Sequence, residues 1–184
     1  PVRQDWTVGQ VLAHIRKVGR DKETLNVVYL IDDKGVLIDD IRLRELILTR
    51  ARRLVAADAG SLYLIKKGEH QERYLYFALA QNDSIIAPWK ASVIPLNPHS
   101  VAGAVAMRGE VVVVDDVYTL PAGGWLHHDQ SFDQRFHYRT RSVVGIPLST
   151  REGEILGVLQ LINRKGHADV PLVAPGAGGE ELRF

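Results

Sequence analysis

Two pairs of apolar, β-branched runs, each joined by a short polar turn, constrain the fold of this chain most strongly. The turn KGEHQE separates SLYLIK (61–66) from RYLYFALA (73–80), and the turn REGE separates RSVVGIPLST (141–150) from ILGVLQLIN (155–163). Such short turns join antiparallel neighbours, because parallel strands need a crossover of a dozen or more residues. The strand-rich stretch from about 59 to 163 therefore predicts an α+β fold, with helices packed on an antiparallel sheet.

Apolar residues at helical spacing predict the helices that accompany this sheet. One long amphipathic helix is predicted for IRLRELILTRARRLVAA (41–57), where arginines separate the apolar positions. HSVAGAVAMRG predicts a second helix, with Ser100 as its N-cap and Gly109 at its end. The stretch 119–138 reads as one long loop, and loops of that length inside a compact domain are often functional.

Composition excludes several classes of protein. The 184 residues carry a net charge of only +1, without the basic stripe that nucleic-acid binding requires. The absence of cysteine excludes disulfides, thiol catalysis and Cys-ligated zinc, and it fits a reducing compartment, so we expect a cytoplasmic protein. No apolar run approaches the roughly 20 residues of a membrane span, and we expect no membrane contact. Because Met107 is the only methionine, we expect a piece of a longer protein.

Histidine and aspartate residues are the candidates for a metal or catalytic site. His127 and His128 are adjacent and His137 follows at a distance, whereas zinc ligands usually form tighter pairs such as H-x3-H. Asp115 and Asp116 directly follow the predicted strand VVVV, where they are expected to cap the next turn. The sequence contains no nucleophile elbow, HExxH motif or P-loop. We therefore predict no catalytic and no metal-binding residues, and we expect that the chain is not an enzyme.

The helix that begins near Ser100 is a better candidate for ligand binding. Helix N-termini present backbone N–H groups that hold phosphates, and the small residues at 101–103 would let a ligand approach. The same small residues also suit close packing of the helix on the sheet, and both interpretations remain open here. Residues 139–141 could donate hydrogen bonds to a polar edge of the ligand, or could simply be charged surface residues beside a strand.

The strand-rich region resembles the GAF domains of cyclic-nucleotide phosphodiesterases, adenylyl cyclases and bacterial signalling proteins. The resemblance rests on ARRLVAADAGSLYLI, IPLNPHSVAGAVAMRGEVVVVDDVY and YRTRSVVGIPLSTREGEILGVLQLINRKG, and it covers about 43–184. It implies a central six-stranded antiparallel sheet with helices on one face and a ligand pocket on the other. It also implies a non-catalytic domain that binds a small molecule, often a cyclic nucleotide, and regulates a covalently attached output domain.

The family's cyclic-nucleotide signature is incomplete in this chain. Asn163 stands at its Asn position, Arg164 replaces the Lys, and Phe184 matches its Phe, so that the sequence ends before the Asp-Glu pair. We accordingly expect the terminal helix of the family to be missing.

The N-terminal part resembles a different family. TVGQVLAHIRKVGRDKETLNVVYLIDDKGVLIDDIRLRELIL (7–48) is similar to one CBS motif of the magnesium transporter type, a helix, strand, turn, strand and helix. We therefore expect two parts, a small α/β CBS-like half module at 1–42 and a GAF domain at 43–184. CBS motifs normally work in pairs that bind adenine nucleotides or ions, and only one copy is present.

Together these patterns predict a small-molecule-sensing regulatory domain. The long loop at 119–138 and the residues that follow it would cover a pocket, and ligand binding would shift the long helix at 41–57. We expect a homodimer, no certain cofactor, and a cyclic nucleotide as the possible ligand. The apolar wall was expected from the strands around Tyr76, Ala78 and Val144. The alternatives are adenine-nucleotide or Mg²⁺ sensing through the CBS-like part, and a ligand-free dimerisation scaffold. The predicted ligand-binding residues are Ser100, Val101, Ala102, Gly103, Asp116, Phe132, Asp133, Thr140, Arg141 and Asn163.

Overall fold

The chain divides into two compact units, Pro1–Ile47 and Leu48–Phe184. The structure, a computed structural model, describes residues 37–166 without a gap and, before them, residues 2–3, 5–6, 10, 14, 27–32 and 34. The first helix of the CBS-like motif lies outside the described residues except for Gln10 and His14, which are helical. Phe184 and the segment where a terminal helix would begin also lie outside them.

The first unit contains a three-stranded sheet. Its strands are β1 (Val2–Arg3), β2 (Val27–Ile31) and β3 (Leu37–Arg42), in that order. β1 runs parallel to β2, and β3 runs antiparallel to it. β3 extends through Arg42, which pairs with Val27, so the helix predicted from 41 begins two residues later. Residues 41 and 42 pair with β2 although the apolar spacing predicts a helix there, because the hydrogen bonds between the strands satisfy the backbone groups of both.

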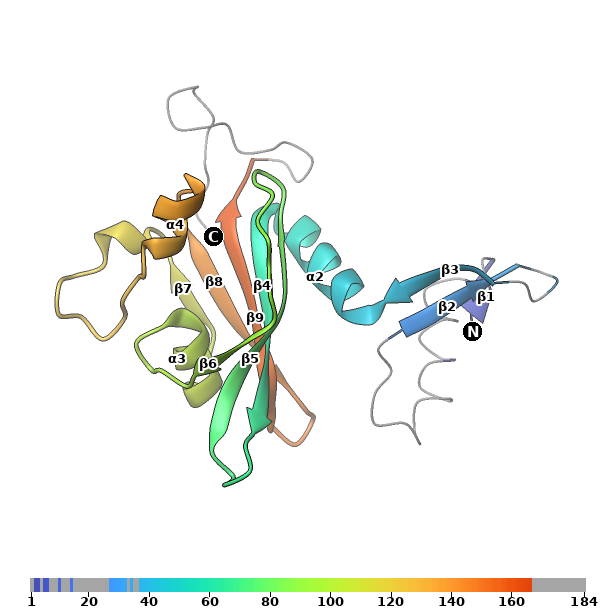
Figure 1. The fold of residues 1–184 in the computed structure, drawn as a ribbon, viewed down its shortest axis with the longest axis horizontal. Coiled ribbons are helices and arrows are strands. Elements are labelled where there is room, and N and C mark those ends of the chain that lie inside the picture. The colour runs from blue at the N-terminus through green and yellow to red at the C-terminus, as the bar shows by residue number, and fades with distance from the viewer. Residues whose placement is uncertain are drawn as a thin grey trace. The chain divides into compact units, whose positions relative to one another are not determined.

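The second unit is built on a six-stranded sheet in the order β6-β5-β4-β9-β8-β7 (Figure 1). Every neighbouring pair is antiparallel, and the two predicted hairpins, β4–β5 and β8–β9, are confirmed. The six-stranded antiparallel sheet implied by the resemblance is therefore confirmed. Its strands are β4 (Ala57–Lys67), β5 (Arg73–Asn82), β6 (Ser92–Pro95), β7 (Val112–Val114), β8 (Val143–Ser149) and β9 (Ile155–Arg164).

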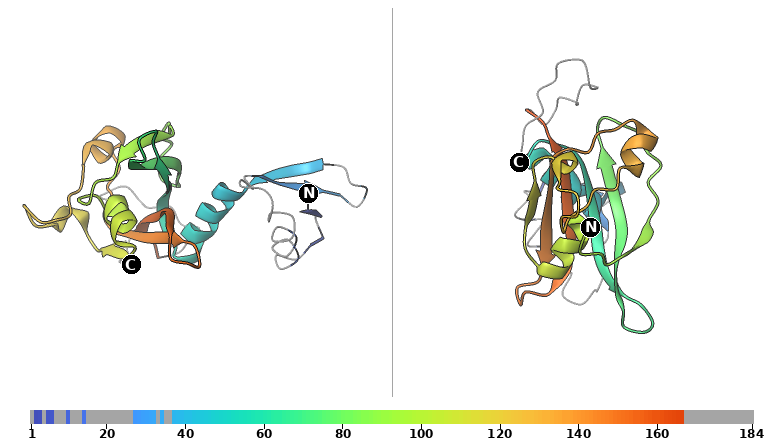
Figure 2. Two further views of the ribbon diagram at one scale, coloured as in Figure 1. Left: turned by 90° about the horizontal axis from the view of Figure 1, so that it is seen from below. Right: turned by 90° about the vertical axis from the view of Figure 1, so that its left-hand side faces the viewer.

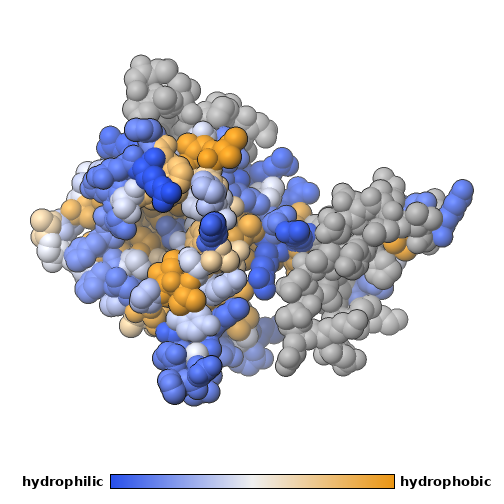
Figure 3. Space-filling view, in the orientation of Figure 1, coloured by the Kyte–Doolittle hydropathy of each residue, from blue (hydrophilic) through white to orange (hydrophobic). Residues whose placement is uncertain are grey.

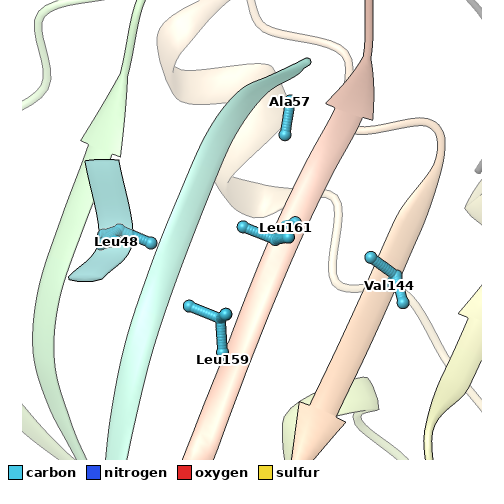
Figure 4. Close-up of a cluster of buried hydrophobic side chains, with 5 residues drawn as sticks. All are labelled: Leu48, Ala57, Val144, Leu159 and Leu161. Atoms are coloured by element: carbon cyan, nitrogen blue, oxygen red, sulfur yellow. The ribbon is translucent and has the colours of Figure 1, made fainter. Parts of the chain in front are cut away.

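Alternation along the central strands divides the core into two layers. Leu159 and Leu161 of β9 point to one face, where they cluster with Leu48, Ala57 and Val144 (Figure 4). Leu48 belongs to α2 (Leu43–Leu54) and is fully buried. Successive strand residues point to opposite faces, so the intervening residues of β9 face the other layer.

The helix α3 (Val101–Arg108) packs on that other face of the sheet. Val105 and Ala106 cluster with Leu75 and Val158, and the right-hand view of Figure 2 shows α3 and α4 in front of the sheet. The resemblance implied helices on one face and the pocket on the other. In this chain α2 covers one face, and α3 and α4 share the second face with the cavity described below.

The ends of α3 follow the local signals in the sequence. Ser100 caps the helix, because its hydroxyl oxygen accepts a hydrogen bond from the Gly103 N–H at 3.1 Å. Gly109 ends it in the left-handed region, with φ of 71° and its N–H donating to the Val105 carbonyl. A residue without a Cβ adopts this conformation at little cost, so the predicted helix and both of its caps are confirmed.

Three elements were absent from the sequence prediction. The segment 119–138, predicted as a loop, contains α4 (Ser131–Phe136), and η2 (Val117–Thr119) overlaps its start. The proline-rich segment before α3 contains β6, which pairs with β5 at the edge of the sheet. Pro95 suppressed the strand prediction, but an edge strand tolerates a residue without an N–H donor.

Gly157 provides a test of the close strand packing. A Cβ built at this position would collide with the backbone carbonyl of Tyr63 on β4, and that carbonyl cannot move without breaking the sheet. We expect Gly157→Ala to lower the free energy of unfolding by about 3 kcal/mol, measured by urea denaturation. Gly166→Ala is the matched control, because nothing lies within 4 Å of its added Cβ. Equal stability of the two variants would contradict the packing described here.

Candidate ligand-binding site

A cavity of about 410 Å³ lies between the sheet, α3 and the long loop. This volume is within the range of small-molecule sites. Alternate residues of three central strands line one side of it, namely Ser61, Tyr63, Leu75, Phe77, Gln160 and Ile162. Because they alternate with the residues that pack against α2, one sheet separates the helix from the cavity.

The apolar wall comes from the two strands that were predicted, but the lining residues are the neighbours of those named. Leu75, Phe77 and Val143 line the cavity, in place of Tyr76, Ala78 and Val144. Val144 packs with Leu48 on the opposite face. A shift of one residue exchanges the faces of a strand, and both faces of these strands carry apolar residues, so their sequence does not reveal which side is hollow.

Three of the four residues predicted at the start of α3 line the cavity: Ser100, Val101 and Ala102. Gly103 does not, and its N–H donates to Ser100 Oγ. A Cβ at Gly103 would collide with the Asn97 carbonyl. Gly103 therefore serves close packing at the helix N-terminus, which leaves the first turn of α3 facing the cavity.

An aromatic series borders the cavity on the side away from α3. Trp89 stacks on Phe132 of α4, with ring centroids 5.1 Å apart, and also contacts Phe77 at 5.9 Å. Phe132 was predicted as a site residue and lines the cavity, as does Trp89. Sequence reasoning missed Trp89, because a tryptophan between prolines carries no periodic signal. Phe132, which stacks on Trp89, lies on α4, and that segment was predicted as a loop.

Asp133 holds the long loop together from inside. Its carboxylate is buried and accepts hydrogen bonds from Tyr118 Oη at 2.7 Å, from His128 Nε2 at 3.2 Å, and from the backbone N–H and the hydroxyl of Thr140, both at 2.8 Å. Asp133 itself does not line the cavity, whereas Thr140 and His128 do. The predicted site residue Asp133 therefore positions the residues that reach the cavity.

The environment of Asp133 also shifts two pKa values. Burial acts to raise the pKa of Asp133, but the hydrogen bonds from His128, Tyr118 and Thr140 outweigh it and lower that pKa below its ordinary value of 3.8. Burial and the hydrogen bond to Asp133 raise the pKa of Tyr118 to about 12. At neutral pH the pair is therefore a carboxylate and a neutral phenol that donates to it.

The predicted residues Asp116 and Arg141 pair with each other. Asp116 Oδ1 accepts from the Tyr118 N–H at 2.9 Å, and Asp116 Oδ2 accepts from Arg141 Nε at 3.2 Å. Neither residue lines the cavity. They join the start of the long loop to its end and so support the cavity from outside.

Asn163 has a similar supporting position and is fully buried. Its Oδ1 accepts from the Arg141 N–H at 2.7 Å, and its Nδ2 donates to the Arg139 carbonyl at 2.7 Å and to Tyr138 Oη at 3.0 Å. Tyr138 lines the cavity. Asn163 therefore fixes the segment 138–141 against the end of β9.

A buried group of charges connects this segment to α2. Asp58 is fully buried, and its carboxylate accepts from Tyr138 Oη at 2.9 Å and from Ser84 Oγ at 2.8 Å, with Lys165 Nζ at 3.8 Å. The Asp58 carbonyl accepts from a guanidinium N–H of Arg52, which lies on α2. Sequence reasoning missed this group, because its members are far apart along the chain.

The histidines are distributed among separate contacts. His128 bonds to Asp133, and His127 stacks on His99 with ring centroids 5.2 Å apart. Among the described residues, no group of three or more His, Asp or Glu side chains gathers in a way that could hold a metal ion. Within the same part of the chain, the helices are too short or too polar to cross a membrane.

This arrangement is that of an α+β ligand-binding domain, and comparison with known proteins identifies its family. The model of the GAF domain family matches residues 41–174, and the chain therefore belongs to the GAF domain family. GAF domains are small-molecule-sensing regulatory domains of signalling proteins, and the expected regulatory class is confirmed.

Two kinds of relative illustrate the match. A cGMP-specific 3',5'-cyclic phosphodiesterase of Drosophila virilis is 29% identical over 142 residues, covering 73% of this chain and 15% of the phosphodiesterase. The chain thus spans less than a sixth of that relative. A hypothetical protein from S. aureus shares the fold, with a TM-score of 0.51, 16% identity, and coverage of 72% of this chain and 100% of that one.

A further solved structure belongs to an enzyme. It is a free methionine-R-sulfoxide reductase from Neisseria meningitidis in complex with its substrate, with 23% identity, a TM-score of 0.44, and coverage of 64% of this chain and 58% of that one. GAF domains are generally regulatory. The CBS resemblance of the N-terminal part has no counterpart among these findings.

The Asp133 cluster predicts a pH-dependent stability. Because the folded pKa is lowered, the ionised carboxylate stabilises the folded chain fully above about pH 4, and the effect is lost as the pH falls through the folded pKa. Asp133→Asn leaves a single acceptor oxygen among four donors and should cost about 3 kcal/mol at pH 7.

Urea unfolding between pH 7 and pH 3 measures this effect. The difference between the original chain and Asp133→Asn should shrink below about pH 4. The control Glu110→Gln removes the same charge from an exposed position and should leave stability nearly unchanged. A difference that stays constant down to pH 3 would contradict the role assigned to the carboxylate.

Proposed function

We propose that this chain senses a small molecule in the cavity and regulates an output domain of a longer signalling protein, with a cyclic nucleotide as the leading candidate ligand. The cavity of about 410 Å³ is the observation that supports this most. It combines aromatic side chains with a few polar groups, which is the usual lining of a small-molecule site. The phosphodiesterase relative is named as specific for cGMP, which also favours a cyclic nucleotide.

The lining offers partners for each part of a cyclic nucleotide. Phe77 and Phe132 line the cavity and could contact a planar base, and the Gln160 side chain could bond to its edge. No Lys or Arg of the described chain lines the cavity. The phosphate would therefore rest on the first turn of α3, where backbone N–H groups and the helix dipole favour an anion.

The predicted site residues take two roles in this proposal. The ligand contacts Ser100, Val101, Ala102, Phe132 and Thr140. The others position these contacts, namely Gly103, Asp116, Asp133, Arg141 and Asn163.

We propose that occupancy reaches α2 through Asp58. A ligand that moves Tyr138 would act on the carboxylate to which Tyr138 donates, and Arg52 of α2 donates to the carbonyl of the same residue. Burial makes each of these hydrogen bonds costly to leave unmade. If the hydrogen bonds of Asp58 differ between the empty and the occupied cavity, α2 would have a different position in each of the two states.

Thermal unfolding tests this ligand proposal. At about 100 times its Kd, a ligand adds roughly 2.7 kcal/mol of stability, which raises the Tm by about 5 to 10 °C. We expect cAMP or cGMP to produce such a shift. Ala59 lines the cavity, so Ala59→Leu should fill it and abolish the shift, leaving the ligand-free Tm unchanged or higher.

Ala122→Leu is the matched control, since it adds the same side chain at an exposed loop position. It should keep the full shift. A nucleotide shift that survives in Ala59→Leu would place the ligand elsewhere, and no shift with either nucleotide would reject the cyclic-nucleotide assignment.

A second candidate function belongs to the N-terminal unit. We propose that this unit is a CBS-like half module that responds to adenine nucleotides or Mg²⁺. Its β2–β3 pair has the strand, turn and strand of that motif, and the parallel β1 is compatible with a helical connection. A shift with AMP, ATP or Mg²⁺ that persists in Ala59→Leu and disappears on deleting residues 1–40 would support it.

A ligand-free dimerisation scaffold is the remaining alternative. We propose a homodimer, for which α2 offers the exposed apolar residues Ile47 and Leu54. A Tm that rises with protein concentration, without any response to ligands, would favour the scaffold. We also propose a cytoplasmic location, which the absence of cysteine supports, and no contact with nucleic acid or membrane.

A further inference from the structure

A second hollow lies on the other side of the aromatic series. This outer groove has a volume of about 540 Å³ and lies between α4, β6 and the segment that joins β5 to β6. Five residues line both it and the inner cavity, namely Tyr63, Phe77, Trp89, Ile94 and Phe132. The shared residues form a partition between two chambers.

The partition presents ring surface to the outer groove. Trp89 and Phe132 stack with an interplanar angle of 20°, and Phe136 packs on Phe132 with centroids 4.8 Å apart. Trp89 remains 38% exposed. Figure 3 shows apolar side chains emerging in patches among hydrophilic ones on the face that it draws. Partly exposed aromatic side chains of this kind provide contact area for a second planar group.

The two chambers differ in charge. Among the residues that the structure describes, Lys90 and Arg135 are the only charged ones that line the outer groove, and both are cationic and exposed. Arg135 lies over the Phe136 ring, 5.3 Å from its centroid, which holds the guanidinium beside the aromatic surface. In the described part of the chain no Lys or Arg lines the inner cavity, and the carboxylate residue in its lining is Asp129.

We propose that the outer groove is a separate binding site for an aromatic anion. The planar ring system stacks on the partition, and the anionic group lies between Lys90 and Arg135. Groups of the sulfonate, carboxylate or phosphate type meet the charge and hydrogen-bond requirements of these two side chains. Because Trp89 and Phe132 border both chambers, occupancy of the groove constrains the wall of the inner cavity.

A matched pair of fluorescent probes tests this proposal on the full chain. Anilinonaphthalene sulfonate carries the ring system and an anion, and phenylnaphthylamine has the same ring system without the charge. The sulfonate probe should bind about fivefold or more tightly than the neutral one at low salt, as two exposed charge contacts allow. The double substitution Lys90→Gln and Arg135→Gln should remove this preference without changing the affinity for the neutral probe.

Two controls locate the probe. The double substitution Lys67→Gln and Arg151→Gln removes the same charge from exposed positions outside both chambers and should keep the preference. Ala59→Leu fills only the inner cavity and should leave sulfonate binding unchanged. Equal affinities for the two probes, no binding of the sulfonate probe, or its loss in Ala59→Leu would each overturn the outer site. None of these results depends on whether a cyclic nucleotide binds in the inner cavity.

Discussion

Alternation along β9 and its neighbouring strands is the constraint on which the second unit depends. Because β9 sends Leu159 and Leu161 to one side and Val158 and Gln160 to the other, one sheet supports a packed layer beneath α2 and a hollow layer beneath the long loop. The packed side provides the burial that stabilises the sheet. The other side can therefore keep a cavity without loss of the fold, as a binding domain requires.

Buried polar groups specify the arrangement of the long loop, which apolar packing alone does not determine. Asp133 accepts four hydrogen bonds from the long loop, and Asp58 joins Tyr138 to Arg52 of α2. Such groups are costly to bury unless they are satisfied, so they favour one arrangement of the loop over many similar ones. This explains how the long loop, which has little regular structure, covers the cavity in one defined conformation. It also gives the cavity a physical connection to α2 that does not run through the apolar core.

The aromatic partition gives the domain a second distinctive property. Trp89 from the β5–β6 connection and Phe132 from α4 meet in a stacked pair. In the described part of the chain, each borders both an inner cavity without Lys or Arg and an outer groove with one of each. The two chambers therefore favour different ligand chemistry while sharing a wall. A domain of this kind could integrate two signals, because any movement of the shared rings changes both volumes.

The sequence by itself determined the features that depend on neighbours along the chain. The two hairpins, the cap at Ser100 and the left-handed Gly109 follow from turn length, a side-chain acceptor and a missing Cβ, and the family followed from longer motifs. Only the tertiary structure decided that Val143 rather than Val144 faces the cavity, and that Asp58 meets Tyr138 across 80 positions. Turn and cap preferences act over a few bonds. The face of a strand and the partner of a buried charge are set by whichever distant segments the sheet brings together.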